Sequence, residues 1–121
     1  YLESHQQYLQ ALAKTDLFVS TARHEFFGIS VVEAIAAGAY PLVPRALAYP
    51  DVLQLEQYPE REQFFYDGSA DQLAARLKDL ATRPPGNDSC SELLRTSVAR
   101  FDWSVRGPQM DQQLAHLVAP V

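Results

Sequence analysis

Apolar and polar positions along the first part of the chain separate helices from strands. Apolar residues recur at helical spacing over residues 2–14, which predicts an amphipathic helix. The uninterrupted apolar run at residues 17–19 is typical of a strand buried on both faces of a parallel sheet. Residues 30–37 are expected to form a second helix that ends at Gly38, and residues 41–44 a second strand. This order predicts the alternation of a doubly wound α/β fold.

The second half of the chain is predicted to be mainly helical. The pattern weakens over residues 45–62, and residues 64–66 then form a candidate third strand. Three helices follow, each predicted to begin at a serine that caps it: Ser69, Ser89 and Ser104. The apolar residues expected on the inner face of the last helix are Met110, Leu114 and Leu117. Trp103 is expected in the core, because a buried tryptophan supplies a large apolar contact area.

The few predicted strands make an incomplete parallel sheet. A complete Rossmann-like nucleotide-binding domain has about six strands. We therefore expect residues 1–121 to be the C-terminal portion of such a domain, with its first strands upstream of Tyr1. The chain starts within a helical pattern and without methionine, which favours a fragment over a processed mature terminus. An uncovered sheet edge can pair with another chain, so we also expect self-association.

Composition restricts the class of protein. The chain has 121 residues, of which 47% are hydrophobic and 21% charged, as in ordinary globular domains. No apolar run approaches the roughly 20 residues of a membrane span, and no signal-peptide pattern is present. The net charge is −5 and the ten basic residues are scattered, so any nucleic acid would be held mainly by another domain. The single cysteine, Cys90, fits a cytoplasmic location, and no metal-ligand spacing is present.

Candidate chemistry is concentrated where the first predicted strand gives way to the second predicted helix. Glu33 is the only charged residue of that otherwise apolar helix, so its carboxylate needs hydrogen-bond donors. In one interpretation it forms a capping box with Ser30, which is what the spacing alone favours. In the other it points into a cleft and accepts hydrogen bonds from ribose hydroxyls. The residues by themselves leave both interpretations open.

Glu25 is predicted to lie in the loop before that helix. Eight residues of an ideal helix rotate by about 80° beyond two full turns, so Glu25 and Glu33 would not share a face. Gly28 also makes a continuous helix through both acids improbable. A loop carboxylate at the carboxyl end of a strand can hold sugar hydroxyls, and the free N–H groups expected at Phe27, Gly28 and Ile29 can face an anion. The alternative is a solvated loop acid.

Residues 20–34, Ser-Thr-Ala-Arg-His-Glu-Phe-Phe-Gly-Ile-Ser-Val-Val-Glu-Ala, resemble the donor-site segment of retaining glycosyltransferases of the GT-B architecture, the glycosyl transferases group 1. Two features narrow the resemblance to the tRNA-queuosine α-mannosyltransferase group and its bacterial relatives. They are the double phenylalanine after His-Glu and the Arg-x-Leu-x-Tyr-Pro stretch of residues 45–50. Most of the wider clan has Gly-Phe-Gly and Gly-Gly-x-x-Glu at these places. The resemblance is close over residues 16–53, although Ala39 stands where a cysteine is expected.

The resemblance implies a role for each candidate residue. Glu25 would bind hydroxyls of the donor sugar, and Glu33 the ribose of the nucleotide. The residues that would line the sugar and diphosphate through backbone groups are Phe27, Gly28 and Ile29. Arg23 and His24 lie beside the site without an assigned role. Residues 42–44 would run beside the nucleotide base.

The resemblance also implies a nucleotide-sugar donor, GDP-mannose being favoured, and queuosine in tRNA as the acceptor. Other acceptors and donors are the alternative among bacterial relatives, and a non-catalytic Rossmann-like binding module is the alternative class. No residue is predicted to act as a catalytic nucleophile, and no metal or other cofactor is expected. The cations that clamp the diphosphate, and the acceptor domain, lie upstream in such enzymes. We therefore expect a cytoplasmic hexosyltransferase whose isolated residues 1–121 are inactive.

Overall fold

A three-stranded parallel sheet forms the centre of the protein. The computed structural model describes residues 3–86 and 89–118. The strands are β1 (Leu17–Val19), β2 (Tyr40–Pro44) and β3 (Phe65–Tyr66), and they pair in the order β1-β2-β3. In the register of the sheet, Phe18 lies opposite Pro41, and Val43 lies opposite Phe65. The three predicted strands are confirmed.

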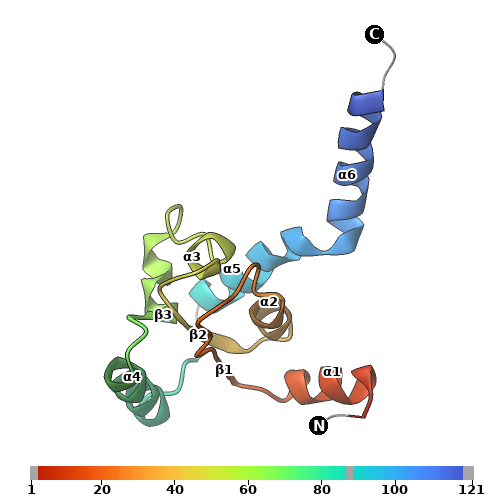
Figure 1. Ribbon diagram of the computed structural model, residues 1–121. Coiled ribbons are helices and arrows are strands. Elements are labelled where there is room, and N and C mark those ends of the chain that lie inside the picture. Colours follow the sequence, from red (N-terminus) through yellow and green to blue (C-terminus); the bar gives the residue numbers. More distant parts are fainter. Residues whose placement is uncertain (1–2, 87–88, 119–121) are drawn as a thin grey trace.

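Helices surround this sheet, as the expected α/β class requires (Figure 1). The α-helices are α1 (His5–Ala13), α2 (Ile29–Ala36), α3 (Tyr49–Val52), α4 (Ala70–Thr82), α5 (Ser89–Val98) and α6 (Trp103–Val118). Two 3-10 helices, η1 (Pro59–Phe64) and η2 (Ala99–Phe101), complete the set in the described ranges. Every parallel connection between strands contains a helix, because parallel strands cannot be joined by a tight turn.

Helix α2 ends where the sequence predicts and begins earlier than predicted. At its C-terminal end, the Gly38 N–H donates to the Ile35 carbonyl at 3.0 Å and the Ala39 N–H to the Ala34 carbonyl at 2.9 Å. Gly38 has φ +100°, the left-handed conformation that this C-terminal motif needs. At the other end the cap is Gly28, with φ +87°, so the helix starts before Ser30.

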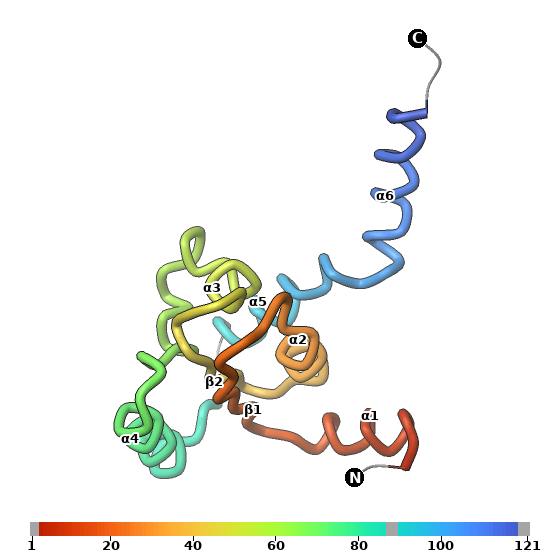
Figure 2. The backbone as a smooth tube through the Cα atoms, viewed as in Figure 1, coloured from red at the N-terminus to blue at the C-terminus, as the bar shows by residue number. Residues whose placement is uncertain are grey.

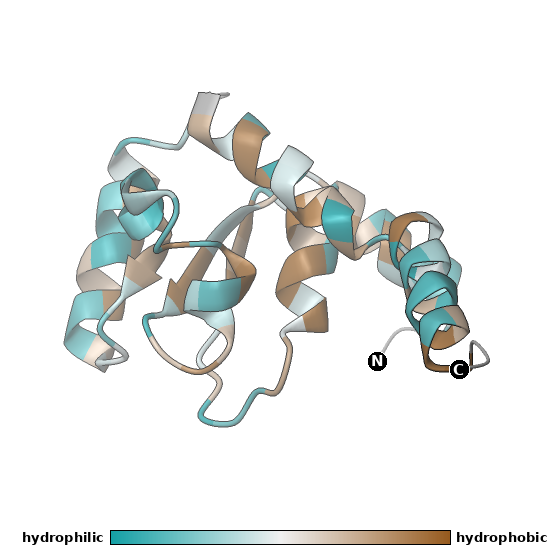
Figure 3. Ribbon diagram, turned by 90° about the horizontal axis from the view of Figure 1, so that it is seen from above, coloured by the Kyte–Doolittle hydropathy of each residue, from teal (hydrophilic) through white to brown (hydrophobic). Residues whose placement is uncertain are grey.

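The hydrophobic core lies between α2, the sheet and α5. Its fully buried side chains come from elements far apart in the sequence. They include Val31, Ile35, Val43, Leu53, Phe64 and Leu94. Figure 3 shows hydrophobic residues, in brown, gathered where the strands and the adjoining helices meet.

Three helices contribute no buried residue to this core, and α6 is the extreme case. Helices α1, α4 and α6 have no buried residues in the described part of the chain. Figures 1 and 2 show α6 projecting away from the body, and its contacts there are with η2 at its start. The predicted core position of Trp103 is wrong, since this side chain is 72% exposed. The side chains expected on an inner face, Met110, Leu114 and Leu117, are also exposed.

Side-chain caps fix the first residue of several helices. Ser4 caps α1 and Ser69 caps α4, and each hydroxyl accepts from the N–H three residues later, at 3.2 Å and 3.1 Å. The Ser69 cap was predicted. Ser104 does not cap α6, because the carboxylate of Asp102 accepts from the Ser104 N–H at 2.8 Å. The cap expected at Ser89 concerns a side chain outside the described part, as does Leu2 at the start of the first predicted helix.

Candidate functional site

The predicted site residues lie on one loop and on the helix that follows it. The loop leaves the carboxyl end of β1, passes through residues 20–28 and enters α2 (Figure 1). Glu25 lies in the loop, as predicted, and Glu33 lies on α2. In a parallel sheet, ligands bind outside the carboxyl ends of the strands. This loop is at that edge.

The N-terminus of α2 has no cap from its own chain. Gly28 has no side chain to act as a cap, and its carbonyl accepts the first helical bond from the Val32 N–H at 3.2 Å. Within the described ranges, no group accepts a hydrogen bond from the N–H of Ile29, Ser30 or Val31. Unpaired N–H groups at the positive end of the helix dipole attract an anion.

Glu25 shapes the loop in front of this N-terminus. Its Oε1 accepts hydrogen bonds from the Phe26 N–H at 3.1 Å and from the Phe27 N–H at 3.4 Å. The prediction that the Phe27 N–H is free therefore needs correction, because the neighbouring carboxylate engages it. No described group donates to Oε2 of Glu25. One oxygen folds the loop and the other remains available.

Glu33 is held by a residue from a distant helix and not by a capping box. The Tyr8 hydroxyl on α1 donates to Glu33 Oε2 at 2.5 Å. Ser30 is already inside α2, so it is not the cap that the capping-box interpretation requires. That interpretation is wrong. The hydrogen bond to Glu33, reinforced by burial and by the carboxylate charge, raises the pKa of Tyr8 to about 12.

A cluster of three hydroxyl side chains holds the start of the loop. Its members are Ser20, Tyr49 and Tyr66. The Ser20 and Tyr49 hydroxyls are 2.7 Å apart, and the Tyr66 hydroxyl donates to the Ser20 carbonyl at 2.9 Å. A Cβ atom on Gly28 would lie 3.3 Å from the Tyr49 ring. Burial, and then the neighbouring Tyr49 and Asp67, raise the pKa of Tyr66. The cluster joins the chain segments that follow β1 and β2 to β3 itself.

Neither this cluster nor Tyr8 was predicted from the sequence. A positional signal existed for two of its members, since Ser20 directly follows the first predicted strand and Tyr66 ends the third. Side chains at those positions meet at one edge of a parallel sheet. No comparable signal existed for Tyr8, because its contact with Glu33 spans 25 positions.

The remaining loop residues make few contacts with other described residues. The Phe27 ring packs edge-on against Phe101 of η2, with ring centroids 4.9 Å apart. Phe26 is fully exposed. Arg23 and His24 are also exposed, and no hydrogen bond or ion pair joins them to other described residues. The side chains of Leu42 and Val43 are fully buried, so it is the backbone of residues 42–44 that would run beside a nucleotide base.

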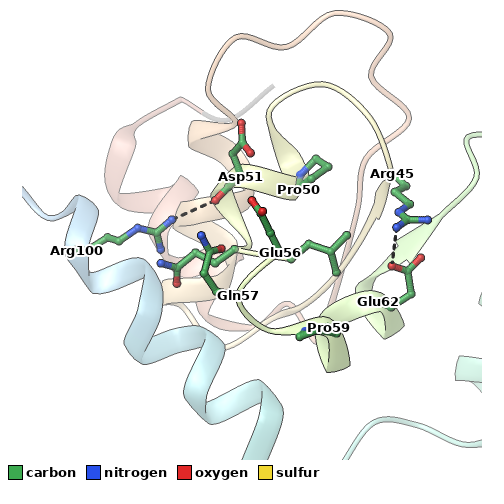
Figure 4. Close-up of a pocket in the computed structure, with 10 residues that line it drawn as sticks. Arg45, Pro50, Asp51, Glu56, Gln57, Pro59, Glu62 and Arg100 are labelled. Carbon is green, nitrogen blue, oxygen red and sulfur yellow. Dashed lines mark hydrogen bonds and ion pairs between the residues drawn. The ribbon is translucent and has the colours of Figure 1, made fainter.

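A pocket of about 620 Å³ lies elsewhere, between α3, η1 and Arg100 (Figure 4). Its lining includes an ion pair of 3.5 Å between Arg45 and Glu62. Arg100 donates to the backbone carbonyls of Asp51 and Val52, at 3.4 Å and 2.9 Å, and so caps the C-terminal end of α3. Both of its arginines are engaged by the protein, and none of the predicted site residues lines it. The pocket is therefore not the candidate site.

In the described ranges, no cluster of three or more His, Cys, Asp or Glu side chains has the arrangement of a metal site. None of the helices there combines the length and the apolar character needed to cross a membrane.

Comparison with known proteins gives a family match and several relatives. The sequence model of the family described as "Glycosyl transferases group 1" matches residues 1–95. The tRNA-queuosine alpha-mannosyltransferase of Drosophila melanogaster is 43% identical over 51 residues, which are 42% of this chain and 14% of that protein. The phosphatidyl-myo-inositol mannosyltransferase of Propionibacterium freudenreichii is 34% identical over 101 residues, 82% of this chain and 26% of that protein.

A plant relative is more distant. The sulfoquinovosyl transferase SQD2 of Arabidopsis thaliana is 26% identical over 94 residues, 78% of this chain and 18% of that protein. The chain thus spans about a quarter or less of the length of these curated relatives. No solved structure matches the chain.

Proposed function

The chain belongs to the glycosyl transferases group 1 family, and on that premise we propose that it forms the donor-binding part of a retaining glycosyltransferase. The observation that carries this proposal is the open N-terminus of α2, with Glu25 before it and Glu33 one turn beyond it. The diphosphate of a nucleotide sugar is an anion that fits unpaired helix N–H groups. A carboxylate on either side suits the hydroxyl-rich sugar and ribose.

Each predicted residue then has a place in the proposed site. Glu25 binds hydroxyls of the donor sugar through the oxygen that the loop leaves free. Glu33 accepts hydrogen bonds from the ribose. The backbone of Gly28 and Ile29 follows the diphosphate, and Phe27 contributes by its packing beside the loop. Arg23 and His24 flank the site on its exposed side.

The proposed chemistry depends on alignment and charge stabilisation. Loss of the nucleoside diphosphate develops negative charge on the leaving group, and fixed N–H dipoles stabilise that charge without reorganisation. Alignment of donor and acceptor supplies much of the remaining barrier reduction. We assign no nucleophile to these residues. Residues 1–121 form the C-terminal portion of the donor domain, inactive alone, in a cytoplasmic enzyme whose acceptor domain and diphosphate-clamping cations lie upstream.

We favour GDP-mannose as the donor and queuosine in tRNA as the acceptor. Support comes from two relatives whose names specify mannosyl transfer, one of them to queuosine in tRNA. The net charge of −5 means that a tRNA would be gripped by another domain. The sulfoquinovosyl relative makes a different sugar the alternative.

A thermal-shift panel tests the donor site. It uses the parent protein, meaning the full natural polypeptide that contains these 121 residues. The panel contains GDP-mannose, UDP-glucose, UDP-N-acetylglucosamine and ADP-glucose. We expect stabilisation by GDP-mannose that is lost in Glu33→Ala and kept in Glu92→Ala, which removes an exposed acid on α5. The absence of a shift with every ligand would favour the non-catalytic binding module.

A further inference from the structure

Helix α1 touches the proposed nucleotide site through one tyrosine. It has no buried residue, and it lies against α2. Tyr8, half-buried between the two helices, donates from its hydroxyl to Glu33 Oε2 at 2.5 Å. This contact between two elements far apart in the sequence calls for an explanation beyond core packing.

The hydrogen bond uses only part of the acceptor capacity of Glu33. A carboxylate has two oxygens and about four lone-pair sites. No other described group donates to Glu33, and Oε1 is without a described partner. A ribose carries two adjacent hydroxyls that can both donate to one carboxylate. Tyr8 and the ribose can therefore bind Glu33 at the same time.

A glutamate without such a contact would be poorly prepared for a ligand. Its side chain has several rotatable bonds, and fixing them on binding costs conformational entropy. Ser30 is the one polar neighbour of Glu33 on α2, and no hydrogen bond joins the two, so α2 itself does not select one rotamer of Glu33. The Tyr8 hydroxyl selects a rotamer before the ligand arrives.

We propose that Tyr8 is a positioning residue that orients the Glu33 carboxylate toward the ribose hydroxyls of a nucleoside diphosphate. This rests on the proposed function, since it assigns the ribose to Glu33. Tyr8 acts through Glu33 and does not itself contact the reacting atoms. Recognition of the ribose diol thus depends on α1 as well as on α2.

A ligand comparison separates orientation of Glu33 from general support of the fold. Calorimetry on the parent protein measures the Kd of GDP and of 2′,3′-dideoxy-GDP, for the wild type and for Tyr8→Phe. We expect Tyr8→Phe to weaken GDP binding about tenfold, because fixing the Glu33 side chain on binding then costs conformational entropy. Binding of 2′,3′-dideoxy-GDP should stay within about twofold, because that ligand has no hydroxyls for Glu33 to accept.

Two variants complete the design. Tyr58→Phe is the matched control, since no described group is hydrogen-bonded to that hydroxyl, and it should leave both Kd values unchanged. Glu33→Gln should weaken GDP binding and make the loss caused by Tyr8→Phe much smaller in the double variant. Thermal unfolding of each variant verifies that it is folded.

The outcomes distinguish the two proposals. An unchanged Kd for GDP in Tyr8→Phe, with a loss in Glu33→Gln, would overturn the role of Tyr8 and leave the donor site standing. An equal loss for GDP and its dideoxy analogue would reduce Tyr8 to a structural role and overturn the inference. A wild type that binds no nucleoside diphosphate or nucleotide sugar would overturn the proposed function itself, and the assignment of Tyr8 with it.

Discussion

Helices α2 and α6 differ in how much of their surface is buried and in how their N-termini are capped. Helix α2 is 8 residues long, buries Val31, Ala34 and Ile35, and has no side-chain cap at its N-terminus. Helix α6 is 16 residues long, buries no residue in its described length, and begins at a hydrogen-bonded Asp102. A helix held by packing can leave its first N–H groups open for a ligand. An exposed helix depends more on its own cap.

The largest expected effect is on the free energy of unfolding. It tests whether packing stabilises α2 and not α6. Ile35→Ala removes a fully buried side chain from α2, and we expect the free energy of unfolding to fall by about 3 kcal/mol. Leu114→Ala on the exposed face of α6 should change it by less than about 0.5 kcal/mol. Urea unfolding of the parent protein measures both. A comparable loss for Leu114→Ala would mean that α6 packs against a surface outside the described residues.

The same contrast explains which parts of the fold could be predicted. Buried elements such as β2 and α2 follow from short apolar runs and from Gly38, because burial imposes a pattern on the sequence itself. The spacing of Met110, Leu114 and Leu117 is equally regular, yet these side chains are exposed. A periodic apolar face predicts a helix. It does not specify whether a partner is present.

The parts of the site that depend on residues close together in the sequence were predictable. The placement of Glu25 in the loop followed from helix geometry and from Gly28. The partner of Glu33 did not, because Ser30 offered a local capping box while the observed donor, Tyr8, comes from another helix. Tertiary hydrogen bonds of this kind override local motifs and leave no spacing in the sequence.

The second-largest expected loss of unfolding free energy concerns two glycines in the left-handed conformation, one at each end of α2. Gly28 has φ +87° and a crowded site, where a Cβ would lie 3.2 Å from Val31 and 3.3 Å from Tyr49. Gly38 has φ +100°, and a Cβ there would meet no described atom within 4 Å beyond its chain neighbours. We expect Gly28→Ala to cost about 2 kcal/mol of unfolding free energy and Gly38→Ala about 1 kcal/mol. Chemical denaturation compares them, and equal losses would show that the contact with Tyr49 is unimportant.

The third effect tests the hydroxyl cluster beneath the loop. Ser20→Ala and Tyr49→Phe each remove one partner of the 2.7 Å hydrogen bond, and each should cost about 1 kcal/mol. Because both remove the same bond, the double variant should cost clearly less than the sum. Tyr58→Phe is again the control. Additive losses in urea unfolding would mean that the two hydroxyls support the loop independently.

The smallest effect concerns the cap of α6 and its dependence on pH. The Asp102 carboxylate accepts hydrogen bonds from the Ser104 hydroxyl and N–H, and these lower its pKa from the ordinary value of 3.8. The ionised cap therefore stabilises the folded state above pH 3.8, and this stabilisation is lost as the pH falls through the lower folded-state pKa. The Ser104 amide proton, followed by NMR from pH 5 to pH 2, should report a transition below pH 3.8 in the wild type. Asp102→Asn should abolish that transition. The amides of Ile29 and Ser30 in α2, which no carboxylate caps, should change much less in both proteins. A transition in the α2 amides over the same range would mean that a carboxylate also reaches that N-terminus, and the contrast between the two helices would fail.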